Sequence, residues 1–329
     1  MLFRRSPGPS VPERPETGVK AEDMKVFITG AAGFIGTYVI QELMRRGDEV
    51  VAFDIAPMPG NFSAYSEGFA YVRGDLTDKL DLYRAITVHR PTHILHLASI
   101  LAGPCEENPG KGFDINFNST VSLMDAAWTL KVERFVMTSS ISVFGPGLDE
   151  PVKDDDVKIP ATVYGQTKLA CEHLMNWYER KGRLSTGGVR FPWVFGPGRS
   201  TGITALWSSK LLDKVARDEE LLIENPDEMG NWLYVKDAVK ALILLLEARN
   251  TPRGIYNIMG SAHSIREVME IAKKIKPEAR IQYKDGAKSV SPYPSLYDDS
   301  NARKEIAWKP DYRIEDSVAE HIKTVSNQS

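Results

Sequence analysis

The chain has 329 residues and a formal net charge of −3, from 41 Lys and Arg against 44 Asp and Glu. A slightly acidic chain lacks the basic surface that nucleic-acid-binding proteins need, so we expect no nucleic-acid partner. The longest aliphatic run, 241–246, is too short to cross a bilayer, so we expect no membrane partner either. Two cysteines, Cys105 and Cys171, are too few for a disulfide framework and favour a cytoplasmic location.

Apolar runs and helical patterns alternate along the chain from Met24 onward. They predict helices over 34–46, ending at Gly47, and from Ala161, and strands over 25–29, 49–53, 69–72, 92–97, 134–139 and 189–194. Strands that alternate with helices favour βαβ units, so we predict an α/β Rossmann fold with a doubly wound parallel sheet. Beyond residue 195 the order loosens into short strands and helices near 203–217, 236–248, 264–275 and 315–324.

A glycine-rich turn joins the first predicted strand to the first predicted helix. Gly30 permits a tight turn, Gly33 lets the backbone approach a pyrophosphate, and Gly36 lets the helix pack closely on the strand. Asp54 ends the next predicted strand, where a carboxylate accepts the adenosine ribose hydroxyls and repels a 2′-phosphate. The pattern therefore predicts NAD, rather than NADP, as the cofactor.

Tyr164 and Lys168 stand four residues apart, which puts them on one face of a helix. The ordinary pKa of a phenol is about 10, and an ammonium group one turn away favours the phenolate, as does a cationic nicotinamide ring. Upstream, the segment 138–145, Thr-Ser-Ser-Ile-Ser-Val-Phe-Gly, closes a predicted strand, where α/β sheets present ligand-facing residues. A serine hydroxyl there is expected to hold the substrate oxygen against the tyrosine.

With these motifs the chain resembles the extended short-chain dehydrogenase/reductase family, also called the NAD-dependent epimerase/dehydratase family, over about 24–321. The resemblance implies that Tyr164 is the acid/base, that Lys168 binds the nicotinamide ribose and lowers the tyrosine pKa, and that Ser140 orients the substrate hydroxyl. It implies a set of cofactor-binding residues: Gly30, Gly33, Phe34, Ile35, Gly36, Asp54, Asp75, Leu76, Leu97, Ala98, Tyr164, Lys168, Pro192 and Val194. The substrate-binding residues that we expect are Ser99, Ser140, Ser142, Trp193 and Thr204.

The motifs divide the chain into three predicted parts. Residues 1–23 hold four prolines and little to bury, which predicts a disordered tail. Residues 24–195 form the predicted NAD-binding Rossmann domain that carries the catalytic residues. Residues 196–329 form a smaller substrate-binding part, interleaved with the first.

Departures from the family pattern bear on the substrate. Nucleotide-sugar enzymes of this family usually carry Asn where this chain has Trp193, and a diphosphate-pairing Arg where it has Gly230. Without that arginine a diphosphate loses charge-assisted hydrogen bonds. The chain is more similar to the short-chain type of L-threonine 3-dehydrogenase, through segments 96–102, 139–146, 190–192, 200–204 and 293–300. That branch has small residues at the place of Trp193, so threonine or another small secondary alcohol stays open.

The leading hypothesis is an NAD-dependent dehydrogenase that oxidises a secondary alcohol of a small polar substrate, such as an L-threonine-like 3-hydroxy acid, by hydride transfer. The alternative is a nucleotide-sugar epimerase or dehydratase that retains its NAD, and a third reading is a nucleotide-binding sensor without turnover. Thr204, or backbone amides near Ile203, is expected to hold the carboxylate or amine end of the substrate, because no arginine stands out for that task.

We expect no metal site and a symmetric homodimer. His89, His93 and His96 lie close in sequence, but no cysteine or carboxylate completes a ligand set. The family commonly pairs through two helices, here about 112–131 and 161–181, which implies a four-helix interface. Apolar residues on these helices that could supply its contacts are Leu123, Met124, Trp128, Leu169, Leu174 and Trp177.

Overall fold

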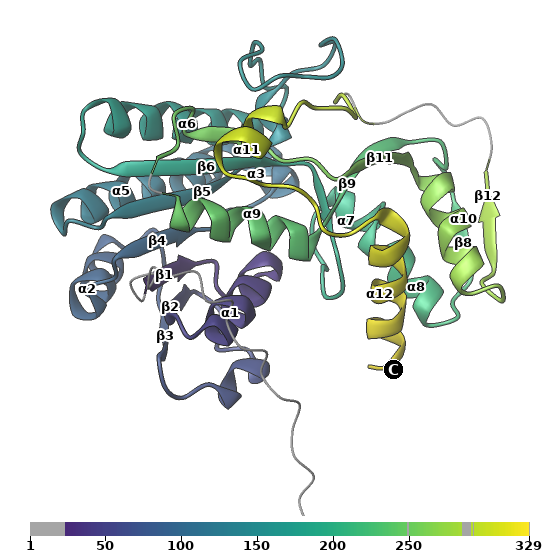
Figure 1. Ribbon diagram of the computed structural model, residues 1–329, viewed down its shortest axis with the longest axis horizontal. Coiled ribbons are helices and arrows are strands. Elements are labelled where there is room, and N and C mark those ends of the chain that lie inside the picture. Colours follow the sequence, from purple (N-terminus) through teal and green to yellow (C-terminus); the bar gives the residue numbers. More distant parts are fainter. Residues whose placement is uncertain (1–23, 249, 285–290, 292, 329) are drawn as a thin grey trace, which may run out of the picture.

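The computed structural model describes residues 24–248, 250–284, 291 and 293–328, so the predicted tail over 1–23 lies outside the described residues. Its centre is a sheet of seven parallel strands in the order β10-β6-β5-β4-β1-β2-β3 (Figure 1). This arrangement confirms the predicted doubly wound Rossmann fold. The strands are β1 (Lys25–Thr29), β2 (Glu49–Asp54), β3 (Phe69–Arg73), β4 (His93–His96), β5 (Arg134–Ser140), β6 (Ser185–Phe191) and β10 (Ile255–Asn257).

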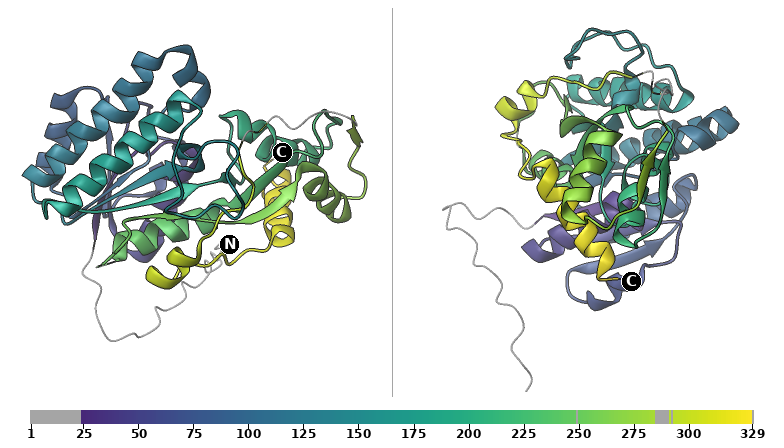
Figure 2. Two further views of the ribbon diagram at one scale, coloured as in Figure 1. Left: turned by 90° about the horizontal axis from the view of Figure 1, so that it is seen from above. Right: turned by 90° about the vertical axis from the view of Figure 1, so that its right-hand side faces the viewer.

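Helices cover both faces of the central sheet, because side chains alternate along each strand. On β1, Val26 and Ile28 belong to one apolar core, whereas Phe27 belongs to the other. Figure 2 shows the two helical layers on opposite sides of the sheet. One layer contains α1 (Phe34–Arg46) and α9 (Val235–Glu247), and the other contains α2 (Lys79–His89), α5 (Ser119–Thr129) and α6 (Val163–Arg180).

The chain after β6 adds two small sheets beside the central one (Figure 1). One joins β11 (Ser261–Ser264), β9 (Met229–Tyr234) and β7 (Trp193–Phe195), and the other joins β12 (Ile281–Tyr283) and β8 (Leu221–Ile223). The helices here are α7 (Ile203–Leu206), α8 (Ser209–Ala216), α10 (Ile265–Ile275), α11 (Ser300–Glu305) and α12 (Ile314–Ser326). Their apolar side chains join the core of α1 and α9, so one continuous core supports both parts.

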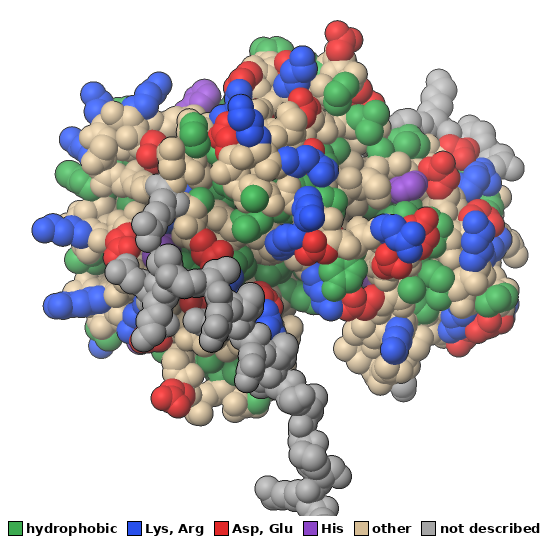
Figure 3. Space-filling view, viewed as in Figure 1, with side chains coloured by type: hydrophobic (Ala, Val, Ile, Leu, Met, Phe, Trp, Pro, Cys, Tyr) green, Lys and Arg blue, Asp and Glu red, His purple; other side chains and the backbone are tan. Residues whose placement is uncertain are grey.

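Short helical turns complete the described chain and carry several cleft residues. They are η1 (Gly60–Ala64), α3 (Ala102–Glu107), α4 (Pro109–Phe113), the π-helical turn η2 (Asp114–Asn118) and η3 (Ile141–Val143). None of the described helices has the length and apolar character needed to cross a membrane. Positive and negative side chains are interspersed over the face in Figure 3, in keeping with the small net charge.

Local signals place some elements to the residue and misplace others. The helix predicted over 34–46 is confirmed as α1, since Gly47 ends it at φ 83°, a left-handed conformation that suits glycine. The single strand predicted over 189–194 is wrong. It is two strands, β6 and β7, because Pro192 has no N–H to continue the ladder of the central sheet. The helix predicted over 203–217 is likewise two helices, α7 and α8.

A buried polar network ties α6 to the ends of two central strands. The Arg190 guanidinium on β6 donates from Nε and Nη2 to the two carboxylate oxygens of Glu172 on α6, at 2.8 Å each. Its Nη1 donates at 3.2 Å to both the Asp154 carbonyl and the Asn257 side chain. Ser139 on β5 donates to the same Glu172 carboxylate at 2.6 Å. All five residues are buried, so α6 is held rigidly against β5 and β6.

Candidate active site

The glycine-rich turn between β1 and α1 is packed too tightly for larger residues. Gly30 has φ 70°, and a Cβ atom there would lie 2.7 Å from the Ala98 nitrogen. A Cβ atom on Gly36 would lie 2.4 Å from the Gly30 carbonyl oxygen. Gly33 is the N-cap of α1 and supplies no side-chain acceptor for its first amides. These amides, at 34–36, therefore suit an anion such as the pyrophosphate of a dinucleotide.

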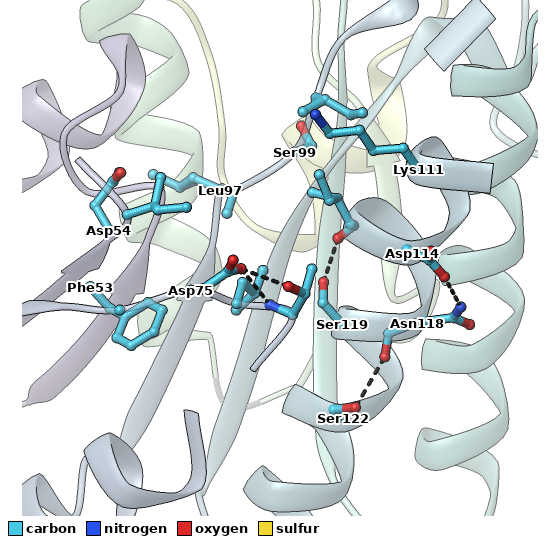
Figure 4. A pocket seen from close by; sticks show the side chains of 18 of the residues that line it. Phe53, Asp54, Asp75, Leu97, Ser99, Lys111, Asp114, Asn118, Ser119 and Ser122 are labelled. Atoms are coloured by element: carbon cyan, nitrogen blue, oxygen red, sulfur yellow. Dashed lines mark hydrogen bonds between the residues drawn. The ribbon is translucent and has the colours of Figure 1, made fainter. Parts of the chain in front are cut away.

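A cleft of about 1090 Å³ runs along the carboxyl ends of β1 to β4, where the winding of the sheet reverses (Figure 4). Its volume is ample for a dinucleotide. The predicted residues that line it are Gly30, Gly33, Asp54, Asp75, Leu76, Leu97, Ala98 and Ser99. Phe53, Ile55, Lys111 and Asn118 also line the cleft and carried no motif that would have identified them.

Two carboxylates lie in this cleft, beyond the ends of β2 and β3. Asp54 accepts from the Ala32 nitrogen at Oδ2 and from the Ala56 nitrogen at Oδ1, both at 2.9 Å. Each carboxylate oxygen keeps a second lone pair, so Asp54 can also accept from ribose hydroxyls. Asp75 Oδ1 accepts from the Thr77 nitrogen and hydroxyl, both at 2.8 Å, which holds its loop in the cleft (Figure 4).

The predicted catalytic residues come together where β5 ends against α6. The Ser140 hydroxyl donates to the Ser142 hydroxyl at 3.1 Å, and Ser140 and Ser99 both hydrogen-bond the Tyr164 phenol. Ser99 also lines the cleft, so it connects the cofactor region with the tyrosine. The 1090 Å³ cleft itself is not lined by the other four residues of this group, Ser140, Ser142, Tyr164 and Lys168.

Close packing at Gly165 brings the first turn of α6 against the serine segment. A Cβ atom at Gly165 would lie 2.1 Å from the Ser142 carbonyl oxygen, so the residue after Tyr164 must be glycine. Lys168, one turn further along, donates from Nζ to the Thr138 carbonyl at 2.9 Å. The same Nζ lies 5.7 Å from the centre of the Tyr164 ring.

Burial dominates the electrostatics of the tyrosine. It raises the pKa of the Tyr164 phenol to about 12, although hydrogen bonds with Ser140 and Ser99 and the positive charge of Arg199 act in the opposite direction. Burial also lowers the pKa of Lys168. Tyr164 therefore keeps its proton at neutral pH in the protein alone, and nearby positive charge favours its ionisation.

Arg199 is a residue of this region that sequence reasoning missed. Its Nη1 donates to the Val194 carbonyl, and its Nη2 donates to the Thr204 hydroxyl at 2.6 Å. The loop that holds it follows β7, so no local pattern indicates that its charge acts on Tyr164. The helix that begins at Ile203 has four residues, too few for its amides to form an anion site.

Trp193 lies in an aromatic core and not among the residues that line the described cleft. It is 6% exposed, and its ring centroid lies 5.5 Å from that of Trp207 and 5.9 Å from that of Trp232. A Cβ atom on Gly230 would lie 2.3 Å from the Trp193 ring. Trp193 and Gly230, the two departures from the nucleotide-sugar pattern, therefore depend on each other. The Trp193 indole fills the space that a side chain at 230 would need.

The His96 side chain belongs to the buried core and not to a metal site. His96 is buried, with Nδ1 2.7 Å from the Thr29 hydroxyl and Nε2 2.8 Å from the Thr120 hydroxyl. Burial lowers its pKa to about 3, so the ring is neutral. Within the part of the chain that the structure describes, no group of three or more His, Cys, Asp or Glu side chains could hold a metal ion.

Comparison with known proteins agrees with this geometry. The model of the NAD dependent epimerase/dehydratase family matches residues 26–258. The chain belongs to the NAD-dependent epimerase/dehydratase family. This confirms the predicted family, the predicted NAD cofactor and the prediction of an NAD-dependent enzyme. The glycine turn, its uncapped amides and the carboxylate at the end of β2 fit that cofactor.

Relatives within the family include both epimerases and dehydrogenases. A UDP-glucose 4-epimerase of Lactobacillus helveticus is 27% identical, over 90% of this chain and 94% of its own. L-threonine 3-dehydrogenase from Trypanosoma brucei has 26% identity and a TM-score of 0.83, over 92% of this chain and 97% of that one. MoeE5, solved with UDP-glucuronic acid and NAD, has 30% identity and a TM-score of 0.80, over 93% and 100%. The substrate must therefore be argued from this chain's own residues.

Replacing Asp54 tests the choice of cofactor in this member of the family. Asp54→Asn removes the negative charge that opposes a 2′-phosphate, so the preference for NAD over NADP should fall by about tenfold or more. The measurement is kcat/KM with each cofactor. Asp75→Asn is the matched control, because Asp75 lines the same cleft beyond the end of a different strand. This variant should change kcat/KM for NAD and for NADP by the same factor. Equal use of the two cofactors by the unmodified enzyme would contradict the assignment.

Proposed function

We propose that this family member is an NAD-dependent dehydrogenase that oxidises a secondary alcohol of a small polar substrate, an L-threonine-like 3-hydroxy acid or a related compound. The observation that carries the proposal is the contact between Trp193 and Gly230. An arginine at 230 would have to pass through the indole, whose ring lies 2.3 Å from the position of a Cβ atom there. A nucleoside diphosphate thus loses both a cation and the space beside it, which favours a smaller substrate.

In this proposal Tyr164 is the acid/base and Ser140 orients the reacting hydroxyl, with Ser142 and Ser99 beside it. The substrate hydroxyl replaces a serine as a partner of the phenol and gives its proton to the phenolate oxygen. Lys168 holds the nicotinamide ribose. Its charged Nζ atom lies 5.7 Å from the centre of the Tyr164 ring, and this charge favours loss of the tyrosine proton. Hydride acceptance is the chemistry that bound NAD supplies. With NAD bound, the alcohol would give its proton to Tyr164 and its hydride to the cofactor, which would leave a ketone.

The second candidate is a nucleotide-sugar epimerase that retains its NAD. The L. helveticus epimerase and the complex of MoeE5 with UDP-glucuronic acid favour it. In such an enzyme the same tyrosine takes a proton and returns it, and no reduced cofactor is released. Net release of NADH therefore separates the two candidates.

We also infer a homodimer that works in the cytoplasm. Trp128 on α5 and Trp177 on α6 are 41% and 38% exposed, and the Arg183 guanidinium lies 4.5 Å and 5.0 Å from their ring centres. This exposed aromatic surface supports pairing through α5 and α6. Leu123 and Met124 are fully buried against the central sheet, so they are excluded from the contacts that the sequence suggested.

The dimer can be tested by mass in solution. Light scattering should give twice the chain mass of 36.7 kDa, and the double variant Trp128→Glu, Trp177→Glu should give the single mass, because charges in an apolar interface are costly. Leu80→Glu is the control, since Leu80 is 81% exposed at the start of α2 and should not affect pairing. A monomeric mass for the unmodified protein would argue against the interface.

Tyr164→Phe tests the acid/base assignment. The variant keeps the ring and loses the hydroxyl, so NAD affinity should stay within about twofold while kcat for oxidation falls by about 10²–10⁴-fold. In the unmodified enzyme kcat/KM for oxidation should rise with pH through neutrality, because burial raises the pKa of Tyr164 and the phenolate is the form that accepts the proton. Tyr283→Phe in the distant β12 should change neither quantity. If Tyr164→Phe retained most of the turnover, another group would have to carry the proton.

A substrate panel tests the proposed reaction class. Steady release of NADH is expected with one or more small hydroxy acids, and UDP-glucose or UDP-galactose should neither raise the melting temperature nor compete with that substrate. The assay follows NADH absorbance over many turnovers and thermal unfolding with each nucleotide sugar. A clear thermal shift with a nucleotide sugar, together with no NADH from any small hydroxy compound, would favour the epimerase.

A further inference from the structure

Arg199 places a positive charge beside Tyr164 that the reaction described above does not use. The residue is partly buried in the loop between β7 and α7. Burial lowers its pKa to about 10, so the guanidinium is charged at neutral pH. The positive charge of Arg199 lowers the pKa of Tyr164, and the phenol raises that of Arg199, so the two groups interact electrostatically.

The guanidinium of Arg199 has donors left over. Its bonds to the Val194 carbonyl and the Thr204 hydroxyl engage two of five N–H groups, and both acceptors are neutral. No Asp or Glu side chain of the described residues forms an ion pair with it. Arg190, by comparison, is buried with the carboxylate of Glu172 in a bidentate pair. A cation withdrawn from water is stabilised best by such a carboxylate, so Arg199 is prepared for an anion that the protein itself does not provide.

Arg199 lies beside the segment of the chain that we expect to contact the substrate. A Cβ atom on Gly202 would lie 2.8 Å from the Leu101 side chain and 3.8 Å from Arg199 Nη2, so the loop 199–204 meets the segment after β4. That segment is tied to the turn of α6 that begins at Tyr164, because the Ile100 nitrogen donates to the Asn116 side chain at 2.8 Å and the Asn116 amide donates to the Thr167 hydroxyl at 3.2 Å. It includes Ser99, which lowers the pKa of Tyr164 through a hydrogen bond. Three segments of the chain therefore meet here, and they carry Tyr164, Ser99 and Arg199.

We propose that Arg199 binds the carboxylate of the substrate, which restricts the substrate class to hydroxy acids. The inference rests on the proposed dehydrogenase function and deepens it. The hydroxyl of the acid is held by Tyr164 and Ser140, and its carboxylate is held by the planar fork of Arg199, so two attachments fix the carbinol carbon between them. Thr204 becomes a positioning residue that orients the guanidinium through its hydroxyl.

Three variants separate carboxylate binding from a bracing role in the loop. Arg199→Met removes the charge and keeps most of the side-chain volume, and Arg199→Lys keeps the charge without the fork. Arg217→Met is the matched control, because Arg217 is an exposed arginine directly after α8. Each enzyme is loaded with NADH, and its cofactor fluorescence is titrated with L-threonine, 3-hydroxybutyrate and the two corresponding amides. The amides have the shape of the acids without the negative charge.

The unmodified enzyme and Arg217→Met should bind at least one acid about tenfold or more tightly than its amide. Arg199→Met should abolish that preference by weakening the acid alone, and Arg199→Lys should retain part of it. Equal weakening of acid and amide in Arg199→Met would show that Arg199 only braces the loop, and would overturn the inference.

Activity assays distinguish failure of the inference from failure of the proposed function. Oxidation of a hydroxy acid with the same KM in Arg199→Met and the unmodified enzyme would overturn the inference and leave the dehydrogenase. Binding of acids that depends on Arg199, without NADH from any of them, would support the anion site and overturn the dehydrogenase. Binding of UDP-glucuronate that depends on Arg199, with no binding of the small acids, would overturn the small-molecule dehydrogenase and keep the carboxylate site, whereas equal binding of UDP-glucuronate and UDP-glucose by the unmodified enzyme and Arg199→Met would overturn both.

Discussion

The ion pair between Arg190 and Glu172 fixes the geometry on which the site depends. Glu172 follows Tyr164 and Lys168 at successive steps of four residues, so all three lie on one face of α6. By holding Glu172 against β6, Arg190 sets the rotation of the helix that presents the tyrosine and the lysine. Loss of Arg190 would leave the buried Glu172 carboxylate without its cation, and a broken buried pair typically costs about 3–5 kcal/mol. The Glu172 carboxylate also accepts a hydrogen bond from Ser139, the neighbour of Ser140. It therefore holds the serine segment at the end of β5 against the helix that carries the tyrosine and the lysine.

Glycine packing complements this pair at the other points of contact. Gly165 lets α6 touch the Ser142 carbonyl, and Gly30 lets the first turn touch the backbone at Ala98. Both contacts are between backbones, where no side chain can adapt. The glycine turn at the cleft is therefore fixed by main-chain contacts, whereas Trp193 and Arg199, which bear on the proposed substrate, lie on the chain after β6.

Relatives of this chain with a similar fold include both an epimerase and a dehydrogenase, so fold alone does not decide the reaction. In this chain the difference concentrates at Trp193, Gly230 and Arg199. The Trp193 indole fills the space beside Gly230, and Arg199 supplies a positive charge that acts on the Tyr164 phenol. Both features support the proposed function, in which the substrate is a small anion and not a large diphosphate.

Local rules allowed the sequence alone to determine the Rossmann sheet, the glycine turn, the extent of α1 and the spacing of Tyr164 and Lys168. Strand alternation, helix period and the left-handed Gly47 act between residues close in the chain. Contacts between distant segments were decided only by the tertiary structure. The break at Pro192 sends β7 to another sheet, where Trp193 meets Gly230, and the loop beyond it brings Arg199 to the segment after β4. No local period encodes such meetings, because they depend on where loops close in space.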